Sequence, residues 1–594
     1  MLRIAIAQQK PRKGDYPHNL ARLGEVFRAL AGDAEPADLL VLPETALTGY
    51  FVEGAVRELA KSADDFFADL SAAHRGSGAP PLDIVAGFFE LHDDRLHNAA
   101  LAATLGGPDA GVRHIHRKVF LPTYGVFDEE RFVEPGKSVR AFDTSWGRAA
   151  VVVCEDAWHS LVPTIAAVDG AQLLIVVSAS PARGLHPEKG GEERPASLLR
   201  WERTAQAIAG EHGMYVALAQ LVGFEGGKGF PGGSLVVGPR GDVLARAKVF
   251  EEDLLLVTVD LGEIARARAD MPLLSDLEMR LPHLLDELEG RRDSENGAAP
   301  ARRRPPAARL PLSPEPARLR PRTNPLEIDP ELTRRWLVEF LRDEVKRRRG
   351  FCRAVVGVSG GVDSAVVLAL AAEALGSGNV TALRMPYRTS SSDSLTHAQL
   401  LIDRLGVPSE TIDISAGVDG LAGALPDRPD AQRLGNICAR VRMAALFDRS
   451  AAGTALPLGT GNKTERLFGY FTWHADDTPP VNPVGDLFKT QVWALARHLG
   501  IPEAIVSKPP TADLVQGQTD EGDFGISYAK ADAILHWLLL GYAAEAIEAL
   551  GFTAAEVALV RGRLDSTHWK RRLPTVAMVS QTAIGEYYLR PVDY

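Results

Sequence analysis

The stretch "AVVGVSGGVDSAVVLAL", residues 354–370, joins an apolar run to an apolar helical pattern through a short loop of glycine, serine and aspartate. This order predicts that a strand ends, a tight turn follows and a helix begins. The first N–H groups of that helix and the positive end of its dipole would then face the loop, which favours the binding of an anion. The lysine of the common phosphate loop G-x-x-x-x-G-K-[ST] is missing.

The composition of the loop indicates one kind of phosphate chemistry. Glycines let the backbone approach an anion closely, serines offer hydroxyl donors, and an aspartate can bind magnesium. A lysine is not needed if the loop holds pyrophosphate that leaves as one unit, as it does when a nucleophile attacks the α-phosphate of ATP. An ordinary strand-to-helix turn is the weaker alternative, since it does not need this set of residues. The predicted ATP-binding residues of the loop are Ser359, Gly360, Gly361, Asp363 and Ser364.

The residues around this loop repeat a strand-then-helix pattern. The expected strands are 354–359, 379–386, 410–415 and 454–460, and the expected helices are 363–376, 394–405, 432–450 and 486–500. Nearly continuous apolar strands followed by helices predict a doubly wound parallel sheet, with ligands at the carboxyl ends of the strands.

Several motifs in this half resemble known families. The string S-G-G-x-D-S resembles the loop of the N-type ATP pyrophosphatases, and the fold that this implies is that of the adenine nucleotide α-hydrolases. From about residue 335 onward the chain is similar to NAD synthetases. The motifs that carry this likeness are "RLGNICARVRM" (433–443), "LGTGNKTERLFGYFT" (458–472), "NPVGDLFKTQVWALARHLGIP" (482–502), "KPPTADLVQGQTDE" (508–521) and "HWKRRLP" (568–574).

This resemblance implies roles for single residues. Thr460 and Lys489 match ATP-contacting positions, and Glu465 matches a magnesium ligand that would act with Asp363. The simpler alternatives are that Lys489 is a lysine on the surface of a helix and that Glu465 is an acidic residue favoured in the first turn of a helix. The chain departs from the family at Pro480, which stands where many members have an aspartate. The positions matched to the binding of nicotinic acid adenine dinucleotide (deamido-NAD) are Arg433, Asn436, Arg440, Glu465, Asp476, His568 and Lys570.

The first half predicts a second α/β domain with a catalytic thiol. Its expected strands are 3–9, 38–44, 83–90, 97–104, 148–155, 172–180, 214–220 and 233–238. Glu44, Lys118 and Cys154 each stand close to the end of an apolar run. A thiolate can attack an amide carbon, a carboxylate can serve as its base, and a lysine can stabilise the oxyanion. If Cys154 is considered without the other two residues, the alternative is a buried cysteine with no chemical role.

These strings resemble the nitrilase superfamily over about residues 1–275. The resemblance implies an α-β-β-α sandwich, a catalytic triad of Glu44, Lys118 and Cys154, and a supporting glutamate at Glu129. The segment "YGVFDE" (124–129) is closer still to the glutaminase domain found fused to NAD synthetases. The residues that would contact glutamine are Tyr124, Glu155, Ser178, Ser180 and Arg183.

Composition limits the class of protein. With 594 residues the chain needs at least two domains, and nine prolines between Pro300 and Pro330 predict a linker. We therefore expect domains at 1–275 and 331–594 joined by residues 276–330. A net charge of −11 gives no sign of nucleic-acid binding. Three cysteines, no signal-like start and no long apolar run favour a cytoplasmic protein without a membrane segment.

Together the two halves predict an enzyme that takes ammonia from glutamine and uses it to amidate deamido-NAD. The expected partners are glutamine, ATP and deamido-NAD, with Mg²⁺, no tightly bound organic cofactor, and assembly into a homo-oligomer. Three alternatives stay open at this point. They are an amidotransferase with another acceptor, an ammonia-only synthetase with an inactive front domain, and a nucleotide-binding protein without catalysis.

Overall fold

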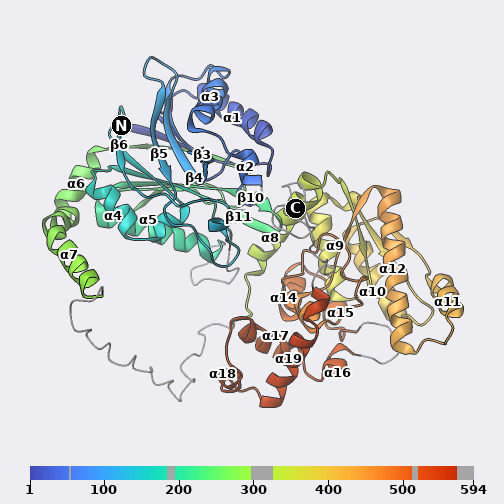
Figure 1. Ribbon diagram of the computed structural model, residues 1–594. Helices are drawn as coiled ribbons and strands as arrows, with labels where there is room; N and C mark the ends of the chain where they lie inside the picture. Colours follow the sequence, from blue (N-terminus) through green and yellow to red (C-terminus); the bar gives the residue numbers. More distant parts are fainter. Residues whose placement is uncertain (53–54, 183–193, 296–324, 512–518, 572–594) are drawn as a thin grey trace. The chain divides into compact units, whose positions relative to one another are not determined.

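The computed structural model describes residues 1–52, 55–182, 194–295, 325–511 and 519–571. The described residues fall into two compact units (Figure 1). The first unit holds the described residues up to 295, and the second holds those from 325 onward. No helix among these described ranges is long and apolar enough to cross a membrane.

Two six-stranded sheets form the centre of the first unit. The first sheet has the order β14-β1-β2-β3-β4-β5, and the second has the order β13-β12-β9-β8-β7-β6. The strands of the first sheet are β1 (Leu2–Gln8), β2 (Leu39–Val41), β3 (Leu82–His92), β4 (Arg95–Leu105), β5 (Gly111–Arg117) and β14 (Asp253–Val259). Those of the second are β6 (Ala141–Asp143), β7 (Arg148–Val153), β8 (Leu173–Ser178), β9 (Tyr215–Gln220), β12 (Leu235–Val237) and β13 (Val243–Arg246). Outside these two sheets, β10 (Val222–Glu225) forms a hairpin with β11 (Lys228–Pro231).

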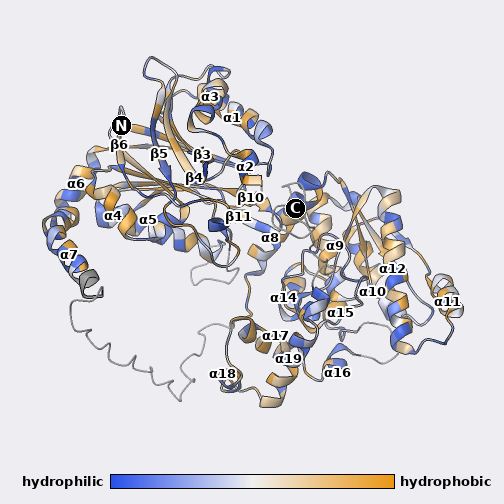
Figure 2. Cartoon of the chain, viewed as in Figure 1, coloured by the Kyte–Doolittle hydropathy of each residue, from blue (hydrophilic) through white to orange (hydrophobic). Residues whose placement is uncertain are grey.

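Alternating side chains join the sheets and helices into layers. In β1, Leu2, Ile4 and Ile6 pack between the two sheets, whereas Ala5 and Ala7 face the helices on the other side. Apolar residues follow the strands throughout this unit (Figure 2). The helices are α1 (Tyr16–Ala31), α2 (Val56–Leu59), α3 (Ala63–Arg75), α4 (Leu161–Val168), α5 (Ala196–His212), α6 (Gly262–Asp270) and α7 (Leu273–Glu295).

The predicted α-β-β-α sandwich is confirmed, with additions. Strands β5, β6, β10, β11, β13 and β14 were not expected from the sequence. Helix α7 continues through Glu295 and so covers the first twenty residues of the predicted linker, 276–295. The proline-rich residues 296–324 lie outside the described ranges.

A four-stranded parallel sheet forms the centre of the second unit, as predicted. Its order is β17-β16-β15-β18, and its strands are β15 (Arg353–Gly357), β16 (Val380–Arg384), β17 (Ser409–Thr411) and β18 (Ala455–Leu458). From β15 the chain runs to β16 and β17 on one side and then crosses to β18 on the other. The carboxyl ends of β15 and β18 therefore flank a topological switch point, where such sheets bind ligands.

Helices pack around this sheet and extend beyond it. Residues of α9 are almost all buried against the strands. The helices are α8 (Pro330–Leu341), α9 (Val362–Leu375), α10 (Ser392–Leu405), α11 (Ser415–Ala424), α12 (Ala431–Gly453), α13 (Lys463–Phe468), α14 (Lys489–His498), α15 (Glu503–Val506), α16 (Asp520–Phe524), α17 (Tyr528–Leu539), α18 (Ala544–Glu548) and α19 (Ala554–Ser566).

Candidate active sites

The thiol of the first unit lies on a sharp turn at the end of β7. Cys154 directly follows the last residue of that strand, is buried, and has a backbone φ of +45°. A positive φ is unfavourable for a residue with a side chain and often marks a functional position. The hydroxyl of Ser178, at the end of the neighbouring strand β8, donates a hydrogen bond of 3.4 Å to Sγ. The turn thus presents the sulfur at the carboxyl edge of the second sheet.

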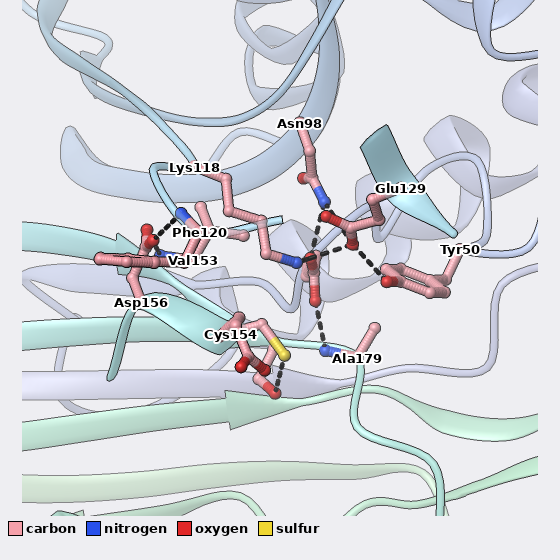
Figure 3. Close-up of polar contacts among 12 residues, drawn as sticks. Tyr50, Asn98, Lys118, Phe120, Glu129, Val153, Cys154, Asp156 and Ala179 are labelled. Carbon is pink, nitrogen blue, oxygen red and sulfur yellow. Dashed lines mark hydrogen bonds and ion pairs between the residues drawn. The ribbon is translucent and has the colours of Figure 1, made fainter. Parts of the chain in front are cut away.

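A buried lysine and glutamate complete a triad beside this turn. Lys118 follows β5 and Glu44 follows β2, and both side chains are inaccessible to solvent. Nζ of Lys118 donates to Oε1 of Glu44 at 2.9 Å. The same oxygen accepts from Asn98 at 2.7 Å, and Oε2 accepts from the backbone N–H of Ala179 at 2.7 Å (Figure 3). Four elements of the sandwich therefore hold one carboxylate in place.

A second glutamate shares the lysine. Nζ of Lys118 donates to Oε1 of Glu129 at 2.7 Å, and the hydroxyl of Tyr50 donates to the same oxygen. Burial alone would lower the pKa of Lys118, but the charges of Glu129 and Glu44 outweigh it and leave this pKa well above its usual value. Burial raises the pKa of Glu129, and Lys118 opposes that rise. Lys118 is thus a permanent cation between two carboxyl groups.

The thiol is protonated before substrate binds. Burial raises the pKa of Cys154, the charge of Glu44 adds to the rise, and Lys118 counteracts it. A thiol in this state becomes a nucleophile only when its proton is removed during the attack. Glu44 is the carboxylate that the surrounding strands fix at this turn, and it is therefore suited to act as the base.

The predicted glutamine contacts lie partly at the rim of this site. The hydroxyl of Tyr124, which is 55% exposed, donates to Oε2 of Glu155 at 2.8 Å. The neighbouring His159 lies with its Nε2 3.6 Å from Oε1 of the same Glu155, and its ring stacks on Phe120. Ser180 follows β8 and is half-buried. The predicted contact Arg183 lies outside the described residues.

The second unit has a cavity of about 330 Å³ at its switch point. The loop after β15 and the residues after β18 both line it, since these neighbouring parallel strands end at the same edge of the sheet. The predicted residues that line it are Ser359, Gly361, Asp363, Ser364, Thr460, Glu465, Asp476 and Lys489. Gly360 belongs to the same loop and has φ +76°, and a Cβ there would lie 2.2 Å from the carbonyl oxygen of Ser394. Only glycine fits this position without a shift of the backbone.

Two carboxylates converge on one lysine in this cavity. Nζ of Lys489 lies 2.5 Å from Oδ2 of Asp363 and 3.4 Å from Oε1 of Glu465. Asn462 donates to the other oxygen of Asp363 at 3.0 Å. Burial raises the pKa of Glu465 to about 7, with Lys489 lowering it and Asp363 raising it. For Lys489, burial opposes protonation but Asp363 and Glu465 prevail, so its pKa is raised.

The donor set fits a magnesium ion that shares its coordination with phosphate. No group of three or more histidine, cysteine, aspartate or glutamate residues within the described ranges is arranged to enclose a metal. Mg²⁺ usually takes one or two protein carboxylates and completes its octahedron with substrate phosphates and water. Asp363 and Glu465 supply two such carboxylates, since an oxygen of each already lies near the same cation, the ammonium of Lys489.

Other predicted residues lie outside the cavity wall. On α12, Asn436 accepts from the Thr472 hydroxyl, and Arg440 donates to the carbonyl of Trp473. Arg433 forms an ion pair with Asp427 at the surface. His568 is exposed, and Lys570 donates to the carbonyls of Gly469 and Phe471. None of these five predicted residues, all within the described ranges, lines the cavity.

Several site residues were not singled out from the sequence. In the first unit they are Tyr50, Asn98 and Asp156, and in the second they are Arg442, Asn462, Lys508 and Asp520. Arg442, Asn462, Lys508 and Asp520 all stand inside the quoted motifs, which was the available signal. Tyr50 stands six residues after Glu44 and Asp156 two residues after Cys154, so proximity to a predicted catalytic residue could have indicated both.

Comparison with known proteins agrees with both sites. The carbon-nitrogen hydrolase family matches residues 3–269, and the NAD synthase family matches residues 333–574. The glutamine-dependent NAD(+) synthetase of Thermotoga maritima is 30% identical over 608 residues, which cover 100% of this chain and 98% of that protein. The NH(3)-dependent NAD(+) synthetase of Chlorobaculum parvum is 47% identical over 263 residues, covering 44% of this chain and 94% of that protein.

Solved structures show the same fold. A glutamine-dependent NAD+ synthetase from Acinetobacter baumannii, in complex with ADP, has a TM-score of 0.70 at 23% identity and covers 100% of this chain and 98% of its own. Another from Cytophaga hutchinsonii has a TM-score of 0.69 at 16% identity, covering 96% and 93%. The chain therefore belongs to the glutamine-dependent NAD(+) synthetases, as the full-length relative and the two matched families show and the two assembled sites support.

Proposed function

We propose that the chain converts deamido-NAD to NAD with ATP and with ammonia released from glutamine. The observation that carries this proposal is the presence, in one chain, of an assembled Glu44–Lys118–Cys154 site and of a cavity with an ATP-type loop. We assign glutamine hydrolysis to residues 1–275 and the synthetase reaction to residues 331–594. A homo-oligomer stays a prediction, which measurement of the mass in solution tests.

Glutamine hydrolysis follows from the contacts of the first site. The sulfur of Cys154 bonds to the amide carbon while its proton passes to Glu44, and the ammonium of Lys118 stabilises the resulting oxyanion. Glu44 then returns the proton to the nitrogen, and the C–N bond breaks to release ammonia. Water, deprotonated by Glu44, attacks the thioester, which restores the thiol and releases glutamate.

The second site then uses this ammonia. The carboxylate of deamido-NAD attacks the α-phosphorus of ATP, and pyrophosphate leaves into the loop that contains Ser359 and Ser364. Ammonia attacks the carbonyl of the adenylate, and AMP departs to leave the amide of NAD. Asp363 and Glu465 would hold Mg²⁺, which supplies positive charge to the phosphates when it is bound. Lys489 and Thr460, which line the same cavity, would also contact ATP.

The test measures NAD formation from deamido-NAD and magnesium-ATP, with glutamine or ammonium as the nitrogen donor. Wild type is compared with Cys154→Ala and with Cys438→Ala, a buried cysteine of the second unit as the control. We expect Cys154→Ala to lose the glutamine reaction and keep the ammonium reaction, whereas the control keeps both. If wild type forms NAD only with ammonium, the assignment of a glutaminase is rejected. If neither donor gives NAD, deamido-NAD is rejected as the acceptor.

The magnesium assignment has its own test. Asp363→Ala removes one of the two carboxylates that meet at Lys489. We expect pyrophosphate release to fall and the binding of Mg²⁺ with ATP, measured by calorimetry, to weaken. Unchanged values for both would remove Asp363 from the site.

A further inference from the structure

We propose that Asp156 is a positioning residue that fixes Lys118 relative to Cys154 across the two sheets. This rests on the proposed glutamine hydrolysis and adds a residue to it. Asp156 lies two residues after the nucleophile and its side chain is inaccessible to solvent. It does not face the sulfur in the described contacts, and its four hydrogen bonds run to the backbone and to His116.

The geometry of the sandwich creates the need for such a residue. Lys118 follows β5, the last strand of the first sheet, whereas Cys154 follows β7 of the second sheet. No shared hydrogen-bond ladder therefore sets the distance between these two strand ends. Catalysis needs that distance to be held closely, because a displacement of about 1 Å can cost a hundredfold in rate.

The carboxylate of Asp156 joins these two strand ends. Its Oδ1 accepts from the backbone N–H groups of Val119, at 3.0 Å, and Phe120, at 2.9 Å, the two residues after Lys118. Its Oδ2 accepts from the backbone N–H of Val153, at 3.2 Å, directly before Cys154. Figure 3 shows the carboxylate between these two segments.

A buried histidine anchors the other side of this carboxylate. Nε2 of His116, on β5, lies 2.8 Å from Oδ2 of Asp156, and neither side chain is exposed. Both oxygens are therefore occupied, by donors from β5, from the loop after it and from β7. Among the described contacts, Asp156 is the carboxylate that links the lysine's loop directly to the backbone of the thiol turn.

Asp156→Asn tests this role because it keeps the size of the side chain and leaves one oxygen acceptor. The amide nitrogen cannot accept from Val153, so one of the two strand ends is released. We expect kcat for glutamate release to fall about a hundredfold, with KM for glutamine within about twofold and the ammonium-dependent reaction unchanged. Asp169→Asn is the matched control, since Asp169 accepts from Ala141 and Arg148 at the opposite end of β7.

A double-mutant cycle separates positioning from a general loss of structure. The rate of Cys154 alkylation by iodoacetamide is measured against pH in Asp156→Asn, Lys118→Ala and the double variant. If Asp156 acts through Lys118, the double variant is no slower than Lys118→Ala alone and its pH profile is the same. The proposal is overturned if the two single losses in alkylation rate add up in the double variant. It is also overturned if Asp156→Asn loses no more alkylation rate than Asp169→Asn does.

A second pair of variants serves if Asp156→Asn does not fold, which loss of its ammonium reaction or a lowered melting temperature would reveal. In His116→Gln the amide nitrogen replaces Nε2 as donor, whereas His116→Leu removes the donor. We expect glutamate release to stay near the wild-type rate in the first and to fall at least tenfold in the second. Equal rates in these two variants would contradict the proposal. Wild type that hydrolyses no glutamine would instead refute the proposed function itself.

Discussion

Replacing Lys489 by methionine tests the charge arrangement of the synthetase cavity. The side chain of Lys489 is 3% exposed, and its Nζ lies 2.5 Å from Asp363 and 3.4 Å from Glu465. Methionine has a similar length but no charge, so two half-buried carboxylates would face each other without a cation between them. Unit charges 3.4 Å apart interact by about 5 kcal/mol at an effective dielectric constant of about 20. Part of this cost is offset because the ammonium no longer has to be buried. We therefore expect the free energy of unfolding to fall by about 3–5 kcal/mol.

This loss should grow with pH. Burial raises the pKa of Glu465 in the folded chain to about 7, above the usual 4.5 of a glutamate, and removal of Lys489 raises it further. A carboxyl group with a higher pKa in the folded state favours folding at low pH, and this contribution is lost as the pH rises through that window. At pH 5.5 Glu465 can take up a proton, and the substitution should cost little. At pH 8 the full cost should appear.

Calorimetric melting at the two pH values measures this difference. For a unit of this size, about 3–5 kcal/mol corresponds to a fall in melting temperature of about 6–20 °C at pH 8. Lys463→Met is the matched control, because Lys463 pairs with Asp486, whose side chain is 96% exposed, and such pairs contribute less than about 1 kcal/mol. Equal melting of the two variants at pH 8, or a loss from Lys489→Met that does not vary with pH, would refute the argument.

Three further substitutions test other parts of the two sites. Glu129→Gln removes a charge beside Lys118, so kcat for glutamate release should fall at least tenfold, and an unchanged kcat would exclude a supporting role. Gly360→Ala puts a Cβ 2.2 Å from the Ser394 carbonyl, so KM for ATP should rise about tenfold, and a wild-type KM would show that the loop can move. Burial raises the pKa of Asp532 to about 6 from 3.8, so stability should fall by about 3 kcal/mol between about pH 4 and 6. Urea midpoints should show this slope in wild type and lose it in Asp532→Asn, and equal slopes would contradict the assignment.

Local patterns allowed the sequence to predict most of the fold. Strands and helices of the second unit follow a regular alternation, and the loop at Gly360 is recognisable because only glycine suits its backbone. Strand β5 was missed because its sequence, "GVRHIHR", is rich in charged and polar side chains, as suits the last strand of a sheet. The short β6 and the partly exposed β13 gave similarly weak signals.

The triad was predictable for the same reason, whereas its partners were not. Glu44, Lys118 and Cys154 each stand at a strand end within a recognisable string. Asn98 lies inside β4, and nothing in its own neighbourhood indicates that it donates to Glu44, 54 residues away. Contacts of this kind depend on how strands are ordered in the sheet, which residue types alone do not specify.

The two sites can be tested separately because the contacts of each, among the described residues, lie within one unit. The described hydrogen bonds of Cys154, Glu44 and Lys118 come from residues between Glu44 and Ala179, and the lining of the synthetase cavity comes from residues 357–520. A substitution at Cys154 or Asp156 therefore removes no contact of the cavity, and the ammonium reaction reports on the second unit in every glutaminase variant. A variant of the first site that lowers the ammonium rate but keeps the wild-type melting temperature would point to communication between the units, because neither misfolding nor a shared residue would explain it.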